Sequence, residues 1–585
     1  MEDRRTAIAI LLIIMTVMMY SEMVLAPTIR PPPPVGAARS ASIQGTSPQT
    51  GAAQNGAGQY GAGLRSSAAV LPGVGAPAAA EQAPSPAEIR AAPSITVDTP
   101  YFIASFTTFG GRLTSFQLKD HRENLQDTRL LDMVSVPENA PLPLGIYSGL
   151  RSDLRTTYSI ASIEPAGSTH LTSAPIFVAP DQTLAITMRG TLSDGSAITK
   201  TFSFQGSSYL FNVAAYLEEP STDGTSLWLE WTRFLPESVL HDPIDPWTFT
   251  SLSDLSKVQH VQLPSITLDG LSQPMSTQWI GIADKYFTAT LLSDQAGFNA
   301  RYGRVGPLFL HRVAGTPSEG RFSLFAGPKD YRVLQQLGNQ LERSIDLGFF
   351  SFLAYPLLIL IRLFHSIFHN YGLAIVGVTL LIKGLFFPLT KASLKSMKAM
   401  QDLQPEMQAL RERVKDPTQL NQEMLQLYKR RGVNPMGGCL PILLQIPVFF
   451  GLYSALLHSI ELRHAAFGLW IHDLSVPERL EFFGINFPIM ILIMGVAMFY
   501  QQWITPMPTI DPAQRRMMLI MSALFPVSFL IFPFPSGLAL YMLTNTSISL
   551  VQQAYLRSDT HKSPGRATTL ASLGIFVIAF VLTLL

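Results

Sequence analysis

The chain has 585 residues, of which 47% are hydrophobic and 14% are charged, and its formal net charge is +1. Because charged residues make up about 25% of an ordinary soluble domain, this composition excludes a wholly soluble protein and indicates a membrane protein with a sizeable soluble part. The single cysteine, Cys439, excludes an internal disulfide. A net charge near zero gives no reason to expect nucleic-acid specificity.

The first 94 residues predict a membrane anchor followed by a disordered linker. Arg4 and Arg5 precede an apolar run that ends near residue 25. A cleaved signal peptide needs small residues at its end, whereas Glu22 and Met23 stand there. We therefore expect residues 1–26 to form an uncleaved transmembrane anchor with a cytoplasmic N-terminus. Residues 27–94 are rich in Pro, Ala and Gly and cannot bury enough apolar surface to fold.

Residues 95–330 carry the pattern of a β domain. Apolar and polar residues alternate over 184–188 and again over 198–204, on either side of a turn that contains residues 194–195 (Asp-Gly). Residues 209–217 form another strand-like run. Many strands with turn signals between them predict a large antiparallel β-sandwich in the periplasm. No Ser/His/Asp grouping, metal-ligand spacing or phosphate loop stands out in this part of the sequence.

Residues 331–370 are expected to form connecting and interfacial amphipathic helices. Within them, 347–368 is apolar but carries Arg362. Nine basic residues follow in 391–431, which the positive-inside rule places in the cytoplasm. With a cytoplasmic N-terminus, an even number of crossings precedes that loop, and the anchor and residues 374–389 already make two. Residues 347–368 are therefore predicted to lie in the outer interface, with Arg362 exposed to water.

Residues 371–556 predict a transmembrane core of five helices. The apolar segments are 374–389, 437–457, 487–504, 517–534 and 538–556. The loops between them alternate between basic and acidic character, as expected for the cytoplasmic and outer sides. Residues 557–585 begin as a basic cytoplasmic loop and end in 19 apolar residues, 567–585, just long enough to span a bilayer. The sequence leaves open whether that last segment crosses.

The cytoplasmic segment 391–434 predicts a helical hairpin. Apolar residues recur at helical spacing as far as Val414, and Asp416 and Pro417 then start a second amphipathic helix. Its methionines are expected on an exposed face, where flexible side chains suit varied apolar partners. Its basic residues form either a solvated surface near the headgroups or a docking site for ribosomes, targeting factors and nascent chains: Lys395, Lys398, Arg411, Arg413, Lys429, Arg430 and Arg431.

Lys383 is a charged residue inside the apolar segment 374–389. A charge in the hydrocarbon costs roughly 2.5–3.5 kcal/mol on insertion scales, so it usually faces protein or water. The alternative is a lysine near a helix end that extends to the headgroups. Thr379 lies one turn earlier on the same helix face, which favours a polar stripe within the core.

Polar residues in the later apolar segments extend this stripe. They are Gln445, Tyr541, Asn545, Ser549 and Gln552, of which the last four follow one another at near-helical spacing. Interhelical hydrogen bonds, worth about 0.6 kcal/mol each on average, are one explanation. The other is a water-filled substrate groove in which Lys383 attracts the acidic or polar tail of an incoming chain.

Several motifs resemble the YidC/Oxa family of membrane protein insertases, and its Gram-negative bacterial branch in particular. The matching stretches are KGLFFPLTK (383–391), LQP (403–405), YK (428–429), VNPMGGCLP (433–441), LWIHDL (469–474) and FPSGL (534–538). The anchor, the linker and the large β domain fit the same branch, so the resemblance covers nearly the whole chain.

The resemblance implies an α+β membrane protein, with a periplasmic antiparallel β-super-sandwich and five core helices around a hydrophilic groove. It implies an insertase and chaperone of the bacterial inner membrane that acts on nascent membrane proteins, alone or with the Sec translocon, without catalysis, cofactor or metal. The family carries an arginine at the position of Lys383, so the charge is kept here but the planar fork is lost. Thr379 matches the family's groove threonine, and Tyr541 matches the first residue of a Tyr-Tyr pair whose second member here is Met542.

Two other functions remain as alternatives. A transporter for a small anionic solute would use Lys383 as its binding charge, but such proteins usually contain repeated halves, and no internal repeat is visible. A membrane-embedded hydrolase would need a nucleophile and a base together, and the apolar segments offer only His458.

Overall fold

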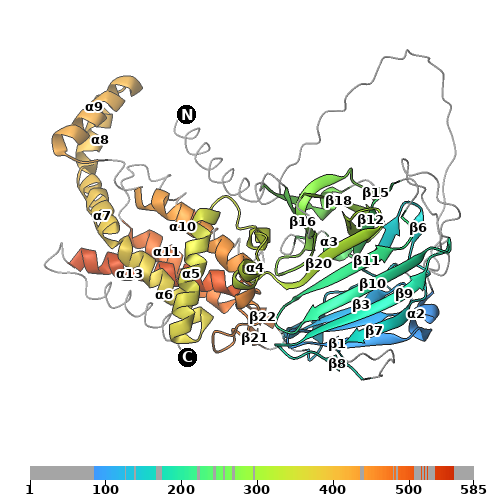
Figure 1. Cartoon of the computed structure of the whole chain (residues 1–585). Coiled ribbons are helices and arrows are strands. Elements are labelled where there is room, and N and C mark those ends of the chain that lie inside the picture. Colours follow the sequence, from blue (N-terminus) through green and yellow to red (C-terminus); the bar gives the residue numbers. More distant parts are fainter. Residues whose placement is uncertain are drawn as a thin grey trace, which may run out of the picture.

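The structure is a computed structural model that describes residues 85–558, apart from gaps at 126, 138–139, 166–173, 221–223, 241–245, 254–256, 267–269, 294–296, 435–439, 479, 483–484 and most of 506–533. The predicted anchor (1–26), most of the linker, nearly all of segment 517–534 and the final apolar residues 567–585 lie outside the described residues. A β domain and a helical region lie side by side (Figure 1).

Two sheets build the β domain. The smaller has five strands in the order β4 (Leu130–Asp132), β3 (Arg112–Arg122), β2 (Phe102–Thr107), β1 (Ser94–Asp98) and β8 (Ile176–Phe177). The larger has 15 strands, and its main path runs β6 (Arg151–Ser152), β5 (Gly145–Ser148), β12 (Leu227–Phe234), β19 (Leu308–Ala314), β18 (Phe298–Val305), β16 (Met275–Ala283), β17 (Phe287–Ser293), β20 (Glu319–Pro328), β11 (Leu210–Leu217), β10 (Ala197–Gln205), β9 (Thr183–Thr191) and β7 (Ser159–Glu164). Beside this path lie β13 (Thr248–Ser253), β14 (Val258–Gln262) and β15 (Gly270–Leu271).

The predicted antiparallel β-sandwich is confirmed, and its hairpin falls where the alternation placed it. Strands β9 and β10 pair antiparallel with Phe202 opposite Ile186. The turn between them carries Gly195 at φ +90°, a conformation that glycine adopts without steric cost. The two sheets meet through aromatic side chains, since the ring of Phe106 lies 4.6 Å from that of Phe202 and 5.7 Å from that of Phe204. Alternation in the sequence thus specified the core face of β9 and β10.

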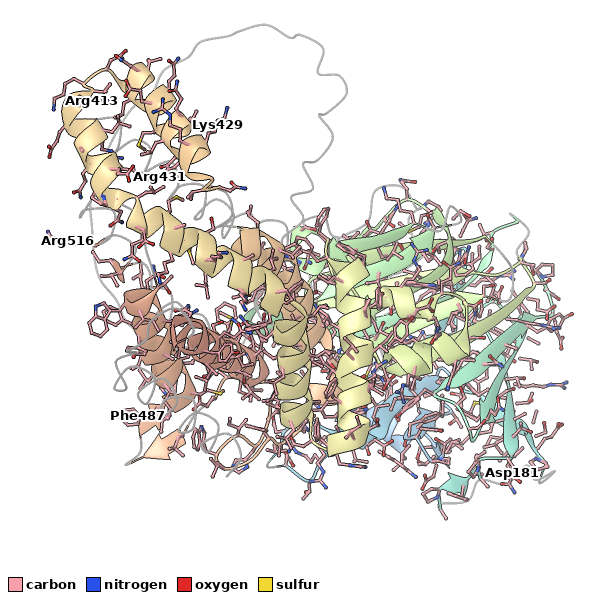
Figure 2. The ribbon with its side chains drawn as sticks, turned by 90° about the vertical axis from the view of Figure 1, so that its left-hand side faces the viewer. Asp181, Arg413, Lys429, Arg431, Phe487 and Arg516 are labelled. Carbon is pink, nitrogen blue, oxygen red and sulfur yellow. The ribbon has the colours of Figure 1, made fainter. Side chains whose placement is uncertain are left out.

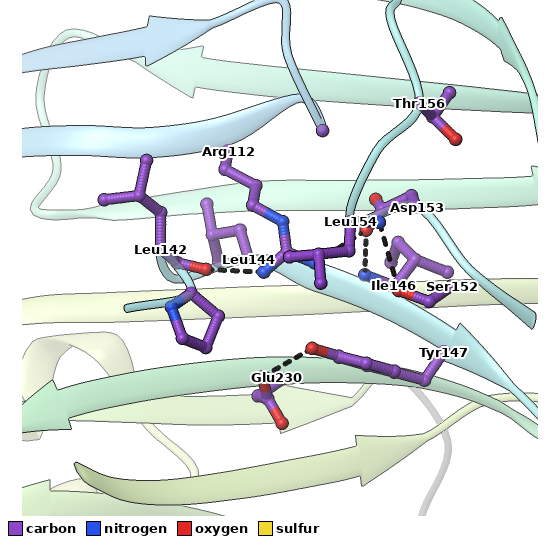
Figure 3. Close-up of polar contacts among 12 residues, drawn as sticks. Arg112, Leu142, Leu144, Ile146, Tyr147, Ser152, Asp153, Leu154, Thr156 and Glu230 are labelled. Atoms are coloured by element: carbon purple, nitrogen blue, oxygen red, sulfur yellow. Dashed lines mark hydrogen bonds and ion pairs between the residues drawn. The ribbon is translucent and has the colours of Figure 1, made fainter. Parts of the chain in front are cut away.

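A buried ionic network joins the two sheets (Figure 3). Asp153 accepts from Arg112 at 3.0 Å and from Lys200 at 2.9 Å, and all three side chains are at most 2% exposed. Backbone carbonyls accept further hydrogen bonds from both cations. Arg112 donates to Leu142 O at 2.7 Å, and Lys200 donates to Leu144 O at 2.6 Å. Burial lowers the pKa of Lys200 to about 8, although Asp153 opposes that shift. One carboxylate therefore holds two buried cations.

Replacing Asp153 with Ala should destabilise the β domain by about 3–5 kcal/mol, because two buried cations would lose the carboxylate that both of them contact. The free energy of unfolding of the full chain in detergent, followed by tryptophan fluorescence, measures this loss. As a matched control, Arg321→Ala removes an exposed pair with Glu319 and should cost less than about 1 kcal/mol. Similar losses in the two variants would contradict the role given to Asp153.

His311 gives the β domain a predictable response to acid. Its side chain is fully buried on β19, neither ring nitrogen has a hydrogen-bond partner among the described residues, and burial lowers its pKa to about 3. The unfolded chain therefore binds a proton at this residue near pH 6.5, whereas the folded chain does not. Stability is fully present above pH 6.5 and falls as the pH drops toward 3.

The His311→Phe variant should lose part of this pH dependence, because phenylalanine does not titrate. Unfolding free energies of the full chain at pH 7, 6, 5 and 4 should fall less steeply for the variant than for the native chain. Parallel curves for the two proteins would show that His311 contributes nothing to acid sensitivity.

Two short elements, α4 (Tyr331–Leu337) and η2 (Leu341–Ser344), connect the β domain to the helices. Three others belong to the β domain: the capped helix α2 (Pro86–Ala91) precedes its first strand, and α3 (Glu237–Leu240) and η1 (Leu263–Ser265) lie between its strands. Helix α2 corrects the predicted linker, whose last residues are ordered by a capping box between Ser85 and Glu88. The helical periodicity after residue 330 is confirmed in α4, but Gly338 at φ +75° ends that helix before Leu341.

The environment of Arg362 differs from the one predicted from the sequence. It was expected in water, yet its side chain is only 10% exposed and pairs with Glu461. Its guanidinium also lies within 4.0 Å of Asp330 and over the ring of Tyr331 at 5.7 Å. Acidic groups from two other elements therefore satisfy the charge, and the arginine joins helix α5 (Ser351–Phe368) to the start of α4 and to η4 (Ile460–Leu462).

The helical region contains α5, α6 (Tyr371–Leu385), α10 (Leu440–His458), α11 (Ile489–Ile504) and α13 (Ser536–Ser558), with the hairpin β21 (Leu480–Phe482) and β22 (Ile485–Phe487) between α10 and α11. Helix α5 packs against α6 and α10, and α13 packs against α6 and α11. Among the described residues, α5 is the single helix long and apolar enough to cross a membrane, or one of two if α6 and α7 are counted as one bent span.

The predicted cytoplasmic hairpin has three helices instead of two. Helix α7 (Phe387–Asp402) continues α6 after a bend of 58°, α8 (Gln404–Arg413) follows a break at Leu403, and α9 (Pro417–Arg431) returns. Asp416 caps α9 as predicted, by accepting from the Thr418 amide. The methionines are not on an exposed face, because Met400 and Met407 are buried and the Tyr428 hydroxyl contacts the Met407 sulfur at 3.7 Å.

Candidate functional site

A hollow that opens to solvent, with a volume of about 410 Å³ when its open part is included, lies between α6, the start of α7, α10 and α13. Its polar lining includes Thr379, Lys383, Gln445, Tyr541 and Asn545, so five of the seven predicted groove residues border one space. Its apolar lining is Ile382, Phe386, Leu389, Leu444 and Val448. Because Thr379 and Lys383 on α6, and Tyr541 and Asn545 on α13, recur at helical spacing, one side of each helix faces the hollow. Gln445 faces it from α10.

Lys383 is half-buried and is held by α13. Its Nζ donates to the Ser549 hydroxyl at 2.7 Å, and the side-chain amide of Gln552 donates to the Lys383 carbonyl at 3.3 Å. Ser549 and Gln552 thus touch Lys383 without lining the hollow. No ion pair in the described part of the chain includes Lys383. Its hydrogen-bond partner is accordingly a neutral hydroxyl.

The other groove residues are ordered by neighbouring helices. Gln445 donates to Asn545 Oδ1 at 3.1 Å, which joins α10 to α13. Thr379 is 1% exposed and donates to the Ile375 carbonyl of its own helix at 2.6 Å. The Tyr541 ring stacks on Phe449 with 6.3 Å between ring centres. Interhelical hydrogen bonds and a shared hollow thus occur together, while the substrate role of the groove stays a prediction.

Thr390 also borders the hollow, although the sequence analysis did not predict it. It follows Lys383 by seven residues, two helical turns, so its position on the same stripe was available from spacing alone. The basic residues after 390 suggested instead that the segment had already left the membrane. The bend at Phe386 keeps Thr390 beside the hollow, where its hydroxyl donates to the Phe386 carbonyl at 3.0 Å.

The basic residues of the hairpin fall into two groups. Arg413 pairs with Glu423 at 2.7 Å and Arg431 pairs with Glu406, so both arginines link α8 to α9. The second group points into solvent or lies along α7: Lys395, Lys398, Arg411, Lys429 and Arg430. Figure 2 shows Arg413, Lys429 and Arg431 at one end of the helical region and Phe487, on β22, toward the other. Charge is thus concentrated at the end where α8 and α9 project.

His458 was the one base that the sequence analysis found in the apolar segments. His458 is directed to its own helix, with Nδ1 3.0 Å from the Ser454 carbonyl. Across residues 85–558, with the gaps given above, no group of three His, Cys, Asp or Glu side chains could hold a metal ion.

Comparison with known proteins identifies the family. Residues 94–360 match a family described as "YidC periplasmic domain", and residues 363–563 match one described as "60Kd inner membrane protein". The membrane protein insertase YidC of Geotalea daltonii is 37% identical over 80% of this chain and 87% of its own length. The chain belongs to the YidC family of membrane protein insertases. The Pelobacter propionicus YidC is 34% identical over 95% of this chain and 99% of its own length.

Membership in the YidC family establishes the insertase function, and the transporter alternative receives no support. A solved structure titled "Active YidC insertase crystal structure with the first transmembrane domain resolved" is 20% identical over 82% of this chain and 97% of its own, with a TM-score of 0.34. The division into a β domain and a helical region agrees with the two family matches, which meet near residue 360.

Proposed function

We propose that the hollow around Lys383 is the groove through which the polar part of a client enters the membrane. The observation that carries this proposal is the Lys383 ammonium, which is held by a serine hydroxyl and lacks an acidic partner among the described residues. An uncompensated charge in an apolar helix is costly unless it faces water or a ligand. A carboxylate or another acceptor on a client supplies such a ligand.

The groove lowers the barrier for a polar tail in two ways. Side-chain amides and hydroxyls of Gln445, Asn545 and Tyr541 replace part of the water that the tail loses, which reduces its desolvation cost. The positive charge attracts acidic residues over a distance that the apolar surroundings screen only weakly. Clients are nascent membrane proteins, inserted alone or after release from the Sec translocon.

The topology proposed here places the N-terminus and the hairpin in the cytoplasm and the β domain in the periplasm of a multi-pass inner-membrane protein. Helix α5 lies in the outer interface. Its exposed apolar face supports this position, because Phe352, Ile359, Leu363 and Ile367 are each more than half exposed and share one side of the helix. The basic hairpin end is oriented inward by the positive-inside rule.

The hairpin is proposed to dock ribosomes, targeting factors and nascent chains through the basic residues outside its two ion pairs. Arg411, Lys429 and Arg430 are exposed and lie on α8 and α9. Their charges are available to phosphates or acidic surfaces, whereas Arg413 and Arg431 are occupied in holding the hairpin together. In this proposal, Arg411, Lys429 and Arg430 bind partners, whereas Arg413 and Arg431 stabilise the hairpin.

Replacing Lys383 with Ala should reduce insertion of a short acidic client about tenfold or more, because an attraction of about 1.4 kcal/mol already corresponds to a factor of ten. Lys383→Arg should retain insertion, since the charge remains. Insertion into proteoliposomes is measured by protection of the client from protease. Lys391→Ala, which removes an exposed lysine two turns away, is the matched control. Full activity of Lys383→Ala would refute the proposed groove.

Changing Arg411, Lys429 and Arg430 together to Gln should weaken binding to ribosome–nascent chain complexes. The slope of log affinity against log salt should fall by about 1 for each phosphate that the hairpin no longer neutralises. Binding is measured by co-sedimentation of the detergent-solubilised chain at several salt concentrations. Arg189, Lys257 and Arg321, exposed on the β domain, changed together to Gln, provide a control of equal charge. Unchanged affinity in the hairpin variant would exclude this docking site.

A further inference from the structure

Ser549 holds the Lys383 ammonium through an oxygen that can act only as an acceptor toward it. The two residues come from α13 and α6, and the Nζ–Oγ distance is 2.7 Å. The single hydroxyl proton of Ser549 is already donated to the Asn545 carbonyl at 2.8 Å. Because a hydroxyl has one proton and two lone pairs, Ser549 Oγ can still accept a hydrogen bond, and it accepts one from the ammonium.

A neutral partner leaves the charge of Lys383 available. An aspartate or glutamate in the place of Ser549 would pair with the lysine and cancel its field in the hollow. The serine fixes the position of the ammonium and takes one of its three donors. The other donors remain for a client acceptor.

The surrounding contacts fix Ser549 in turn. Gln552, three residues along α13, donates to the Lys383 carbonyl at 3.3 Å, so α13 grips both the backbone and the side chain of the lysine. Asn545, one turn before Ser549, accepts from Gln445 of α10 at 3.1 Å. Three helices are thereby linked around the ammonium, which counteracts the flexibility of the four-carbon lysine stem.

We propose that Ser549 is a positioning residue that presents the Lys383 ammonium to acidic residues in the client's polar tail. This inference rests on the proposed groove and adds a determinant of client preference to it. Ordering the ammonium before the client arrives removes part of the entropy cost of forming the new ion pair. The benefit is larger for clients that bring a carboxylate than for clients that bring a neutral amide, because a hydrogen bond between two ionised groups is stronger and depends more on geometry.

The test compares two short clients that differ only by Asp or Asn in the translocated tail, inserted by the full chain in proteoliposomes. The ratio of the two insertion rates reports preference for the carboxylate. Ser549→Ala should lower this ratio about fivefold, the effect of one net hydrogen bond, while changing insertion of the Asn client little. Ser549→Thr keeps the hydroxyl and should keep the ratio.

Ser547 offers a matched control on the same helix. Its hydroxyl donates to the Leu543 carbonyl at 2.8 Å, the same local bond that Ser549 makes, and Lys383 does not contact it. Ser547→Ala should leave the ratio unchanged. The Ser549→Thr and Ser549→Val pair repeats the comparison with side chains of similar size, in case the alanine variant does not accumulate.

Each outcome decides between the proposals. An unchanged ratio in Ser549→Ala, or an equal loss for both clients, would overturn the positioning role and leave the groove standing. Lys383→Ala inserting both clients as well as the native chain would overturn the groove itself, whatever Ser549 does. Loss of preference in Ser549→Ala and Ser549→Val, with retention in Ser549→Thr, supports the inference.

Discussion

The hydrogen bond from Lys383 to Ser549 joins two helices at a point where a charge meets mostly apolar surroundings. The bond reflects a constraint on the helical core, which must supply polar groups near Lys383. An ammonium at this depth requires a polar partner and access to water or ligand, so α13 carries a stripe of hydroxyl and amide groups that an ordinary apolar span would lack. Asn545, in the same stripe, accepts a hydrogen bond from Gln445 of α10, and both residues border the hollow. Lys383, which has no acidic partner among the described residues, thus lies where three helices meet, at the site of the proposed groove.

The β domain also contains buried cations, but there a carboxylate pairs with them. There, Arg112 and Lys200 are buried with Asp153 and with backbone carbonyls, away from any ligand. The contrast is between a buried ion network, in which a carboxylate compensates the cations, and Lys383, whose side-chain hydrogen bond goes to a neutral hydroxyl. Both sites lie on the boundary between packed elements, because a charge that is shared between elements fixes their relative position.

The junction between the two regions is built as a continuous core. Ala354 and Leu358 of α5 and Ala455 of α10 belong to the same buried cluster as the β domain. The Trp279 indole donates to the Asn339 carbonyl between α4 and η2 at 3.0 Å, and Arg362 pairs with Glu461. The helices that border the hollow are therefore braced by the β domain through α5 and α10.

By itself, the sequence determined the two kinds of region, the alternating strands, the helical spacing around Lys383 and the family. These features depend on local periodicity and on motifs along one segment. Tertiary structure alone decided that Ser549 holds the ammonium, that Arg362 is paired instead of exposed to water, and that the hairpin breaks at Leu403. The physical reason is that each of these outcomes is set by a partner on another element or by the angle between helices. Spacing in the sequence shows which residues share a face, and packing selects the neighbour that the face meets.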